Sequence, residues 1–188
     1  MSKKELPSPE LLRQLLRYEP DTGKLYWKKR DISFFNTTEK RSAKHACVQW
    51  NSRLAGKEAF TADDGKGYRN GLIFKKVYSA HRIIWTMFYG AAPINQIDHI
   101  NGIRNDNRIS NLRAVSSKEN SMNRAIRNDN SSGCTGVYFV KKTCRWVCTI
   151  SANGRLVHLG SFADKNDAIT ARKEAEAKYG FHPNHGRR

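Results

Sequence analysis

The sequence lacks the segments that would place a protein in or across a membrane. No apolar run reaches the ~18 residues that span a bilayer. Residues 1–10 are charged and contain two prolines, where a signal peptide would have an apolar core. Internal repeats and low-complexity tracts are absent as well. We therefore expect a globular protein in the cytoplasm.

Cysteine is scarce, and its spacing excludes a familiar kind of zinc site. The four cysteines include no Cys-x-x-Cys pair. If Cys144 and Cys148 lie on one strand, their Cα atoms are ~13 Å apart, too far to share a disulfide or a zinc ion. We expect reduced cysteines with structural roles.

Acidic residues are few beside the basic ones. Lys and Arg number 34 against 17 Asp and Glu, which gives a formal net charge of +17. An excess spread along the whole chain is the electrostatic footprint of a polyanion binder. It predicts a nucleic-acid partner but leaves the chemistry open, because passive RNA-binding proteins share such a charge.

Hydrophobic spacing and turn residues predict several short elements before residue 95. They are a helix at 8–18 with Ser8 as its N-cap, a strand or hairpin arm at 25–27, strands at 71–74 and 76–78, and a helix at 81–89 that ends at Gly90. Residues 31–66 suggest turns in an irregular segment and predict no definite element.

The segment from Gln96 to Arg124, QIDHINGIRNDNRISNLRAVSSKENSMNR, carries the most informative pattern. Asp98 and His99 precede a loop rich in Asn and Gly that leads to Asn111. Ser116 and Glu119 then form a capping box, which predicts the start of a helix. That helix carries Asn120 in its first turns.

These residues suit metal-assisted hydrolysis of a phosphodiester. The reaction needs a nucleophilic water, a base with a pKa near neutral, and positive charge on the phosphate and leaving oxygens. Asp98 and Asn120 offer oxygen ligands suited to one Mg²⁺ or Mn²⁺ ion per active site. His99 would be the base.

The order and spacing resemble the HNH endonuclease family of the ββα-metal fold, in particular its phage and intron-encoded homing type. Asn111 follows His99 by twelve residues, and Asn120 follows Asn111 by nine. Asn at these two positions, where other members carry His, is a recurrent variant. The resemblance implies that His99 activates water, that Asp98 and Asn120 bind the metal, and that Asn111 holds the loop so that His99 points at the scissile phosphate.

Upstream segments extend the resemblance over most of residues 10–125. Residues 18–27 (YEPDTGKLYW) and 78–85 (YSAHRIIW) look like the segments that precede the motif in phage members. His81 lies in the second of these and resembles a family feature, but we interpret it first as a capping or core histidine. Taken singly, an Asp-His pair or an Asn-rich loop usually has a structural role. Their occurrence together, in this order and in a basic chain, specifically indicates the nuclease motif.

Two arginines after the motif are candidates for DNA contact. Arg124 and Arg127 follow Asn120 on the predicted helix, where they would either touch the phosphate backbone or form a solvated face. We favour phosphate contact, because the metal-binding face must lie against the duplex.

Residues 128–134 are polar and rich in turn formers, as a linker is. Beyond it, strands are expected at 136–141, 145–151 and 155–159, with a hairpin turn at Asn153-Gly154, followed by a helix at 164–179. One face of the sheet would pack on the helix through Ala168, Ala171, Ala175 and Tyr179. The residues of that inner face are Val137, Phe139, Trp146, Cys148, Ile150, Val157 and Leu159.

The opposite face of this sheet is polar, basic and aromatic, as a sheet lying in a DNA major groove would be. Its candidate DNA-binding residues are Tyr138, Lys141, Lys142, Arg145, Thr149, Arg155 and His158. Lys141 and Lys142 could alternatively form only a solvated turn.

Residues 131–181 resemble the plant ethylene-response-factor (APETALA-type) DNA-binding domain, seen also as an accessory domain on phage HNH enzymes. The resemblance is carried by Gly136-Val137, Trp146, Ile150, residues 159–162 (LGSF) and the Ala-rich helix. Several arginines that read bases in the plant proteins are Tyr138, Thr149 and His158 here, so the target sequence cannot be transferred.

We therefore expect an α+β protein with a ββα-metal HNH core, an N-terminal α/β elaboration, and a small three-stranded antiparallel sheet packed on one helix. The expected parts are a nuclease domain at 1–127 with its motif core at 78–127, a linker at 128–134, a DNA-binding domain at 135–182 and a basic tail at 183–188.

The predicted function is a metal-dependent endonuclease of homing type that nicks or cleaves double-stranded DNA. It would act as a monomer on DNA in the cytoplasm, that of the host cell if the chain is phage-encoded, with no membrane and no small-molecule substrate. One alternative is a non-catalytic transcription regulator that binds DNA through the C-terminal sheet. A second, suggested by charge alone, is an RNA-binding structural protein, which leaves the ordered motif unexplained.

Overall fold

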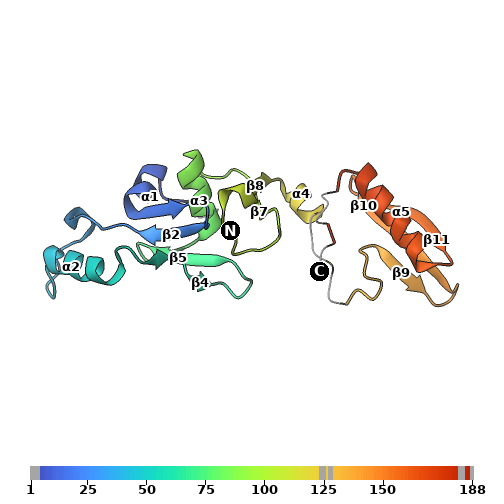
Figure 1. Cartoon of the computed structure of the whole chain (residues 1–188), viewed down its shortest axis with the longest axis horizontal. Helices are drawn as coiled ribbons and strands as arrows, with labels where there is room; N and C mark the ends of the chain where they lie inside the picture. The colour runs from blue at the N-terminus through green and yellow to red at the C-terminus, as the bar shows by residue number, and fades with distance from the viewer. Residues whose placement is uncertain (1–4, 123–125, 127–128, 182–184, 187–188) are drawn as a thin grey trace. The chain divides into compact units, whose positions relative to one another are not determined.

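The computed structural model describes residues 5–122, 126, 129–181 and 185–186. The chain divides into two compact units, Met1–Val115 and Ser116–Arg188. The first contains helices and several small antiparallel sheets, and the described part of the second contains helices and one antiparallel sheet (Figure 1), which confirms the α+β class. No helix in the described part of the chain is long and apolar enough to cross a membrane.

The first unit begins with α1 (Pro9–Leu15), which starts as expected, since Ser8 Oγ accepts a hydrogen bond from the Leu11 amide at 3.3 Å. The helix is shorter than the predicted 8–18. Leu16 adopts an extended conformation and opens strand β1 (Leu16–Glu19). Leu16 continues the leucine spacing of the helix, but it reaches the same core from a strand.

A three-stranded antiparallel sheet follows in the order β1-β2-β3, formed by β1 with β2 (Lys24–Trp27) and β3 (Glu58–Ala59). The strand expected at 25–27 is therefore confirmed. Gly23 has a φ of 72° at the turn between β1 and β2. A Cβ at Gly23 would lie 2.5 Å from the Arg108 backbone nitrogen, so only glycine allows the loop at 107–108 to approach this turn.

The prediction of an irregular segment at 31–66 is wrong. This segment contains the short helix η1 (Ile32–Phe34), the twelve-residue helix α2 (Ala43–Leu54) and strand β4 (Ala62–Asp63), in addition to β3. The hydrophobic pattern did not predict α2, because this helix buries only Ala46 and lacks the apolar stripe by which an amphipathic helix is recognised in a sequence.

A second antiparallel sheet has the order β4-β5-β6 and contains β5 (Arg69–Ile73) and β6 (Lys76–Ser79). Helix α3 (Ala80–Tyr89) follows and ends at Gly90, whose φ is 72°. These elements confirm the predictions for residues 71–90. Helix α3 supplies Ile83, Ile84 and Met87 to the core of the unit, where they join the leucines of α1 and β1.

The two-stranded hairpin that carries the motif completes the first unit. Strand β7 (Gln96–His99) pairs antiparallel with β8 (Leu112–Val115), and a long loop with the short helix η2 (Ile109–Asn111) joins them. Ile97 and Leu112 anchor the hairpin in the core.

The second unit begins with α4 (Ser117–Met122). The predicted capping box is confirmed, because the Ser116 amide donates to Glu119 Oε2 at 2.7 Å and the Glu119 amide to Ser116 Oγ at 3.2 Å.

A sheet of order β11-β10-β9 forms the body of this unit, from β9 (Val137–Val140), β10 (Arg145–Ala152) and β11 (Arg155–Phe162). Helix α5 (Lys165–Lys178) packs on it, capped by Asp164. Asn153 and Gly154 both have positive φ at the hairpin turn, as expected. The three-stranded sheet on one helix is thus confirmed.

Three details of the second unit differ from the expected packing. Phe139, expected on the inner face, is 44% exposed. Helix α5 buries Arg172 and Glu176 beside Ala168 and Ala175, so its inner face is partly charged. A register shift between Cys148 and Thr149 breaks the regular alternation of β10 against β11.

The segment proposed as a linker contains ordered turns. Asn130 Oδ1 accepts a hydrogen bond from the Gly133 amide at 2.7 Å, and Ser132 Oγ donates to the Cys134 carbonyl at 2.8 Å. Cys134 belongs to the core of the second unit. All four cysteines are free thiols, and Cys144 lies in the turn before β10.

Candidate functional site

The β7–β8 hairpin sets Asp98 and His99 side by side at the end of one strand. Asp98 pairs in register with Arg113, and His99 with Leu112. The Asp98 carboxylate accepts from Arg113 through Oδ2, at 2.8 Å from Nη2 and 3.1 Å from Nε. Arg113, which sequence reasoning did not single out, thereby holds this carboxylate in one orientation.

His99 is almost completely buried, with 2% of its surface exposed. Its Nε2 lies 3.1 Å from Oδ1 of Asn107, which is itself buried. An amide oxygen can only accept, so this pair assigns the proton to Nε2 and leaves the lone pair on Nδ1. Asn107 is a second residue that sequence reasoning missed, because an Asn in an Asn-rich loop reads as a turn former.

Two rings pack against the imidazole of His99. The His81 ring centroid is 5.4 Å away and that of Tyr68 is 5.7 Å away. Burial is the largest cause of the lowered pKa of His99, and it lowers the pKa of His81 to about 4. Both imidazoles are therefore neutral at neutral pH.

His81 is partly buried, and its ring packs against those of Tyr68 and His99. It does not cap α3, whose N-cap residue is Ser79. Its Nδ1 is buried without a hydrogen-bond partner among the described residues. The structure adds that this histidine packs directly beside the motif histidine.

Asn111 closes the loop between the two strands. Its Oδ1 accepts from the Asn101 amide at 2.9 Å, its Nδ2 donates to the Asp106 carbonyl at 2.8 Å, and its carbonyl accepts from the Ile100 amide at 2.8 Å. One buried side chain thus joins both ends of the loop.

The Asp106 carboxylate adds charged hydrogen bonds within the same loop. Its carboxylate accepts from Asn101 Nδ2 at 2.7 Å and from Arg108 Nη2 at 2.6 Å. Hydrogen bonds from Arg108 are the largest cause of its pKa, which lies at about 2. The carboxylate is therefore charged at neutral pH.

The N-terminal segment braces the loop from the other side. The Tyr18 hydroxyl accepts from the Ile109 amide at 2.8 Å and donates to the Asn107 carbonyl at 3.0 Å. Burial raises the pKa of Tyr18 to about 12, so the hydroxyl keeps its proton. Tyr18 thus fixes the backbone of the residue that holds His99.

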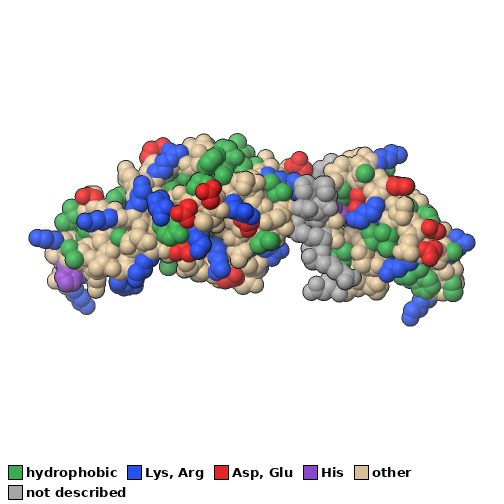
Figure 2. All heavy atoms as spheres, in the orientation of Figure 1, with side chains coloured by type: hydrophobic (Ala, Val, Ile, Leu, Met, Phe, Trp, Pro, Cys, Tyr) green, Lys and Arg blue, Asp and Glu red, His purple; other side chains and the backbone are tan. Residues whose placement is uncertain are grey.

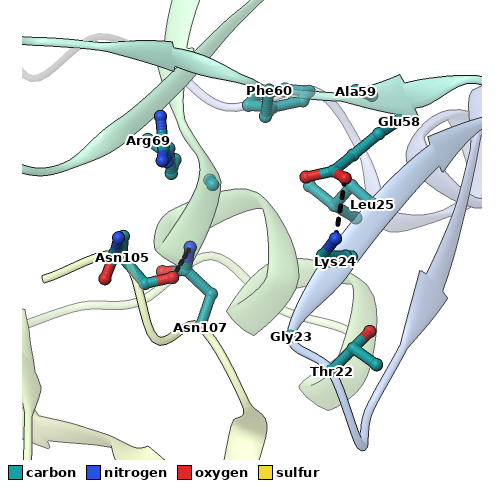
Figure 3. A pocket seen from close by; sticks show the side chains of 11 residues that line it. Thr22, Gly23, Lys24, Leu25, Glu58, Ala59, Phe60, Arg69, Asn105 and Asn107 are labelled. Atoms are coloured by element: carbon teal, nitrogen blue, oxygen red, sulfur yellow. Dashed lines mark hydrogen bonds and ion pairs between the residues drawn. The ribbon is translucent and has the colours of Figure 1, made fainter. Parts of the chain in front are cut away.

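A polar cavity of about 220 Å³ lies next to this brace. Figure 3 shows Asn105 and Asn107 on one side of it and the Lys24–Glu58 ion pair, 3.0 Å long, on the other. Asp98, His99 and Asn111 are not among its lining residues. The cavity is therefore not the place where the motif would meet a substrate.

The structure thus brings Asp98, His99 and Asn111 together in the first unit. Asn120 lies on α4, in the second unit. Arg124 and Arg127 lie outside the described residues. No group of three or more His, Cys, Asp or Glu side chains that could hold a metal occurs in the described ranges.

The candidate DNA-binding residues of the second unit lie mostly on its surface. Tyr138, Lys141, Lys142, Arg145, Arg155 and His158 are exposed. Register pairs Thr149 with His158 and Val147 with Tyr138, which places these residues on one face of the sheet. Thr149 is half-buried, and its hydroxyl lies 3.4 Å from the Gly136 carbonyl oxygen.

Comparison with known proteins agrees with the motif. The family model described as HNH endonuclease matches residues 78–122, which contain the end of β6, α3, the β7–β8 hairpin and α4. Residues 78–122 are an HNH endonuclease domain. The chain is also 34% identical over 86 residues to protein 3.8 of Escherichia phage T7, covering 44% of this chain and 71% of the phage protein. It belongs to the family of that protein.

No solved structure matches this chain. The HNH resemblance is therefore confirmed for residues 78–122, whereas the resemblance of residues 131–181 to the ethylene-response-factor domain stays a prediction.

Proposed function

We propose that this HNH protein is a metal-dependent endonuclease, of homing type, that nicks or cleaves double-stranded DNA. The observation that carries the proposal is the pairing of His99 Nε2 with Asn107 Oδ1 at 3.1 Å, beside a fixed carboxylate on Asp98. A general base needs an unprotonated nitrogen in a fixed position, and this pairing leaves Nδ1 to take a proton from water.

The lowered pKa of His99 suits this role, because the imidazole then enters the reaction neutral, with its proton on Nε2 and a free lone pair on Nδ1. Asn111 acts as a positioning residue. Its three hydrogen bonds hold the loop that carries Asn107, and Asn107 in turn holds the imidazole.

The donor set fits a hard cation. Asp98 and Asn120 would hold one Mg²⁺ or Mn²⁺ through a carboxylate and an amide oxygen, the ligand chemistry these ions prefer. When bound, the ion supplies positive charge to the scissile phosphate and the leaving oxygen. Arg113 orients the Asp98 carboxylate through Oδ2.

The second unit would anchor the enzyme on its substrate. Tyr138, Arg145, Thr149 and His158 would face the major groove, flanked by Lys141, Lys142 and Arg155 at the turns. Arg124 and Arg127 would contact phosphates near the cut. The chain would act as a monomer on DNA.

A plasmid-nicking assay tests the proposal. In the presence of Mg²⁺ or Mn²⁺ the parental chain should convert supercoiled plasmid to the open-circular or linear form, and a chelator should stop the reaction. His99→Ala and Asp98→Ala should abolish nicking and keep DNA affinity within about twofold, because neither residue supplies positive charge for the duplex. Full nicking activity in either variant, or in the presence of the chelator, would contradict the proposed mechanism. DNA binding without nicking by the parental chain would favour the regulator alternative.

A further inference from the structure

Helix α2 presents a face for which neither the fold nor the HNH motif gives a use. Its exposed residues recur at helical spacing along the whole element and form one continuous stripe, which we call the α2 face: Lys44, His45, Val48, Gln49, Ser52 and Arg53. The helix is 12 residues long and buries only Ala46.

The opposite side of α2 is firmly attached to the first unit. The Trp50 ring contacts Trp27 edge to face at 5.7 Å, and the Arg30 guanidinium lies 3.9 Å from the Trp50 ring centroid. Asn51 exchanges two hydrogen bonds with the Arg30 backbone, at 2.8 and 2.9 Å. The helix is thus held as a preformed element, and a partner would not need to order it.

The charge of the α2 face is of one sign. From residue 40 to residue 57 the chain has five Lys or Arg residues and no Asp or Glu. Among the described residues no carboxylate forms an ion pair with Lys44 or Arg53. Figure 2 shows Lys and Arg side chains over the end of the unit that α2 occupies.

Helix α5 shows what an ordinary solvated face looks like in the same protein. Its exposed residues include Asp167 and Glu174 as well as Lys173 and Lys178, so both signs are mixed. A mixed face has no preference for a polyanion. The contrast identifies the α2 face as complementary to a negatively charged partner.

The shape and composition of the α2 face favour a DNA groove over loose contact with phosphates. An α-helix of ~10–12 Å diameter fits the ~12 Å major groove of B-DNA. Val48, 62% exposed at the middle of the stripe, could contact a thymine methyl group. Gln49 beside it accepts a hydrogen bond from Arg41 through Oε1, and its Nε2 could donate to a base edge. Lys44 and Arg53 lie near the two ends of the helix, where a groove brings phosphates close.

We propose that α2 is a DNA-recognition helix that lies in the major groove of the double-stranded substrate. The inference rests on the proposed function for its partner. Figure 1 shows α2 at the end of the first unit that lies away from β7 and β8. The helix therefore contacts the duplex away from the scissile phosphate and adds a second recognition element to the sheet of the second unit.

Salt-dependent binding of a 30-base-pair duplex by the full chain, measured by fluorescence anisotropy in chelator, tests this inference. The Lys44→Ala/Arg53→Ala variant should bind about tenfold more weakly. The slope of log affinity against log salt should fall by about 1.8, since each lost phosphate contact removes about 0.9.

The matched control is Arg17→Ala/Lys24→Ala, which removes the same charge from the same unit. Both of these side chains are exposed and already paired, Arg17 with Glu19 at 3.2 Å and Lys24 with Glu58 at 3.0 Å. A slope for the α2 variant equal to that of the control would overturn the inference.

A photoreactive benzophenone amino acid in place of Val48 gives an independent readout. It should crosslink to the duplex, and the same group in place of Ala177, exposed on α5, should not. If the parental chain binds and nicks DNA but position 48 gives no crosslink, the proposed role of α2 is contradicted and the proposed nuclease function is not. If position 48 crosslinks and the salt slope falls, but the chain never nicks DNA, the nuclease function is contradicted and the role of α2 as a DNA-binding helix is supported.

Discussion

Around the motif the first unit buries neutral polar side chains, whereas the second buries an ion pair between its helix and its sheet. In the first unit His99, Asn107 and Asn111 are buried around a loop that bonds mostly to itself. In the second, Arg172 and Glu176 are buried between helix and sheet, joined at 2.9 Å. The neutral group fixes the position of one imidazole, whereas the charged pair joins α5 to β10.

Arg172 makes this second role plain. Its Nη1 donates to the Thr149 carbonyl at the register shift of β10, its Nε to Glu176, and its Nη2 lies 3.2 Å from His185 Nε2. These contacts hold a helix, a strand and the C-terminal segment together. Buried polar groups therefore predict chemistry only where they surround a group that reacts, and elsewhere they indicate structure.

The largest effect should come from breaking the buried charged pair. Arg172→Ala removes the guanidinium that is buried against Glu176 and the Thr149 carbonyl, and leaves only Lys173 and His185 beside the buried carboxylate. This loss should cost ~3–5 kcal/mol of the stability of the second unit. Lys173→Ala is the control, because Lys173 contacts the same carboxylate from an exposed position and should cost under ~1 kcal/mol. Hydrogen exchange measured separately over each unit checks both values. Equal protection in the two variants would contradict the structural role of Arg172.

Acid should weaken the first unit through its neutral histidines. His81 has a pKa of about 4 in the folded chain and an ordinary value of 6.5. Above pH 6.5 both states are neutral; between 6.5 and 4 only the unfolded state gains the proton, so stability falls by up to ~3 kcal/mol. Urea unfolding monitored through Trp27, Trp50 and Trp85 should show this slope. His81→Phe should flatten it, and an unchanged slope would show that His81 is not its source.

The contact between His99 and Asn107 should matter more for rate than for stability. Asn107→Ala removes the acceptor that orients the imidazole, and the nicking rate should fall by about 10²-fold, as expected for a misplaced base. Asn105→Ala is the control, since the amide of Asn107 contacts only the backbone carbonyl of residue 105, at 3.4 Å. Single-turnover nicking of plasmid compares the variants. If Asn107→Ala nicks at the same rate as the control, the contact with Asn107 is not needed to position His99 for the reaction.

The smallest effect should come from single charges on the sheet of the second unit. Arg155→Ala removes one exposed guanidinium from the predicted DNA face, so the salt slope of binding should fall by about 0.9. Lys178→Ala, exposed on α5, should leave the slope unchanged. Equal slopes for both variants would count against a DNA-facing sheet.

Sequence alone determined the features that local chemistry specifies. The capping box at Ser116, the glycine end of α3, the Asn153-Gly154 hairpin and the order of the HNH motif all depend on residues near one another in the chain. Each of these has a stereochemical signature that no distant contact is needed to create.

Tertiary structure decided which polar residues support that motif and where helices without an apolar stripe lie. Asn107, Arg113 and Tyr18 gained roles only through partners across the hairpin or some ninety residues away. Helix α2 is attached by an aromatic cluster around Arg30 rather than by a periodic apolar face. Long-range contacts of this kind leave no periodic trace in the chain, because the residues that make them are chosen by position in space and not by spacing in sequence.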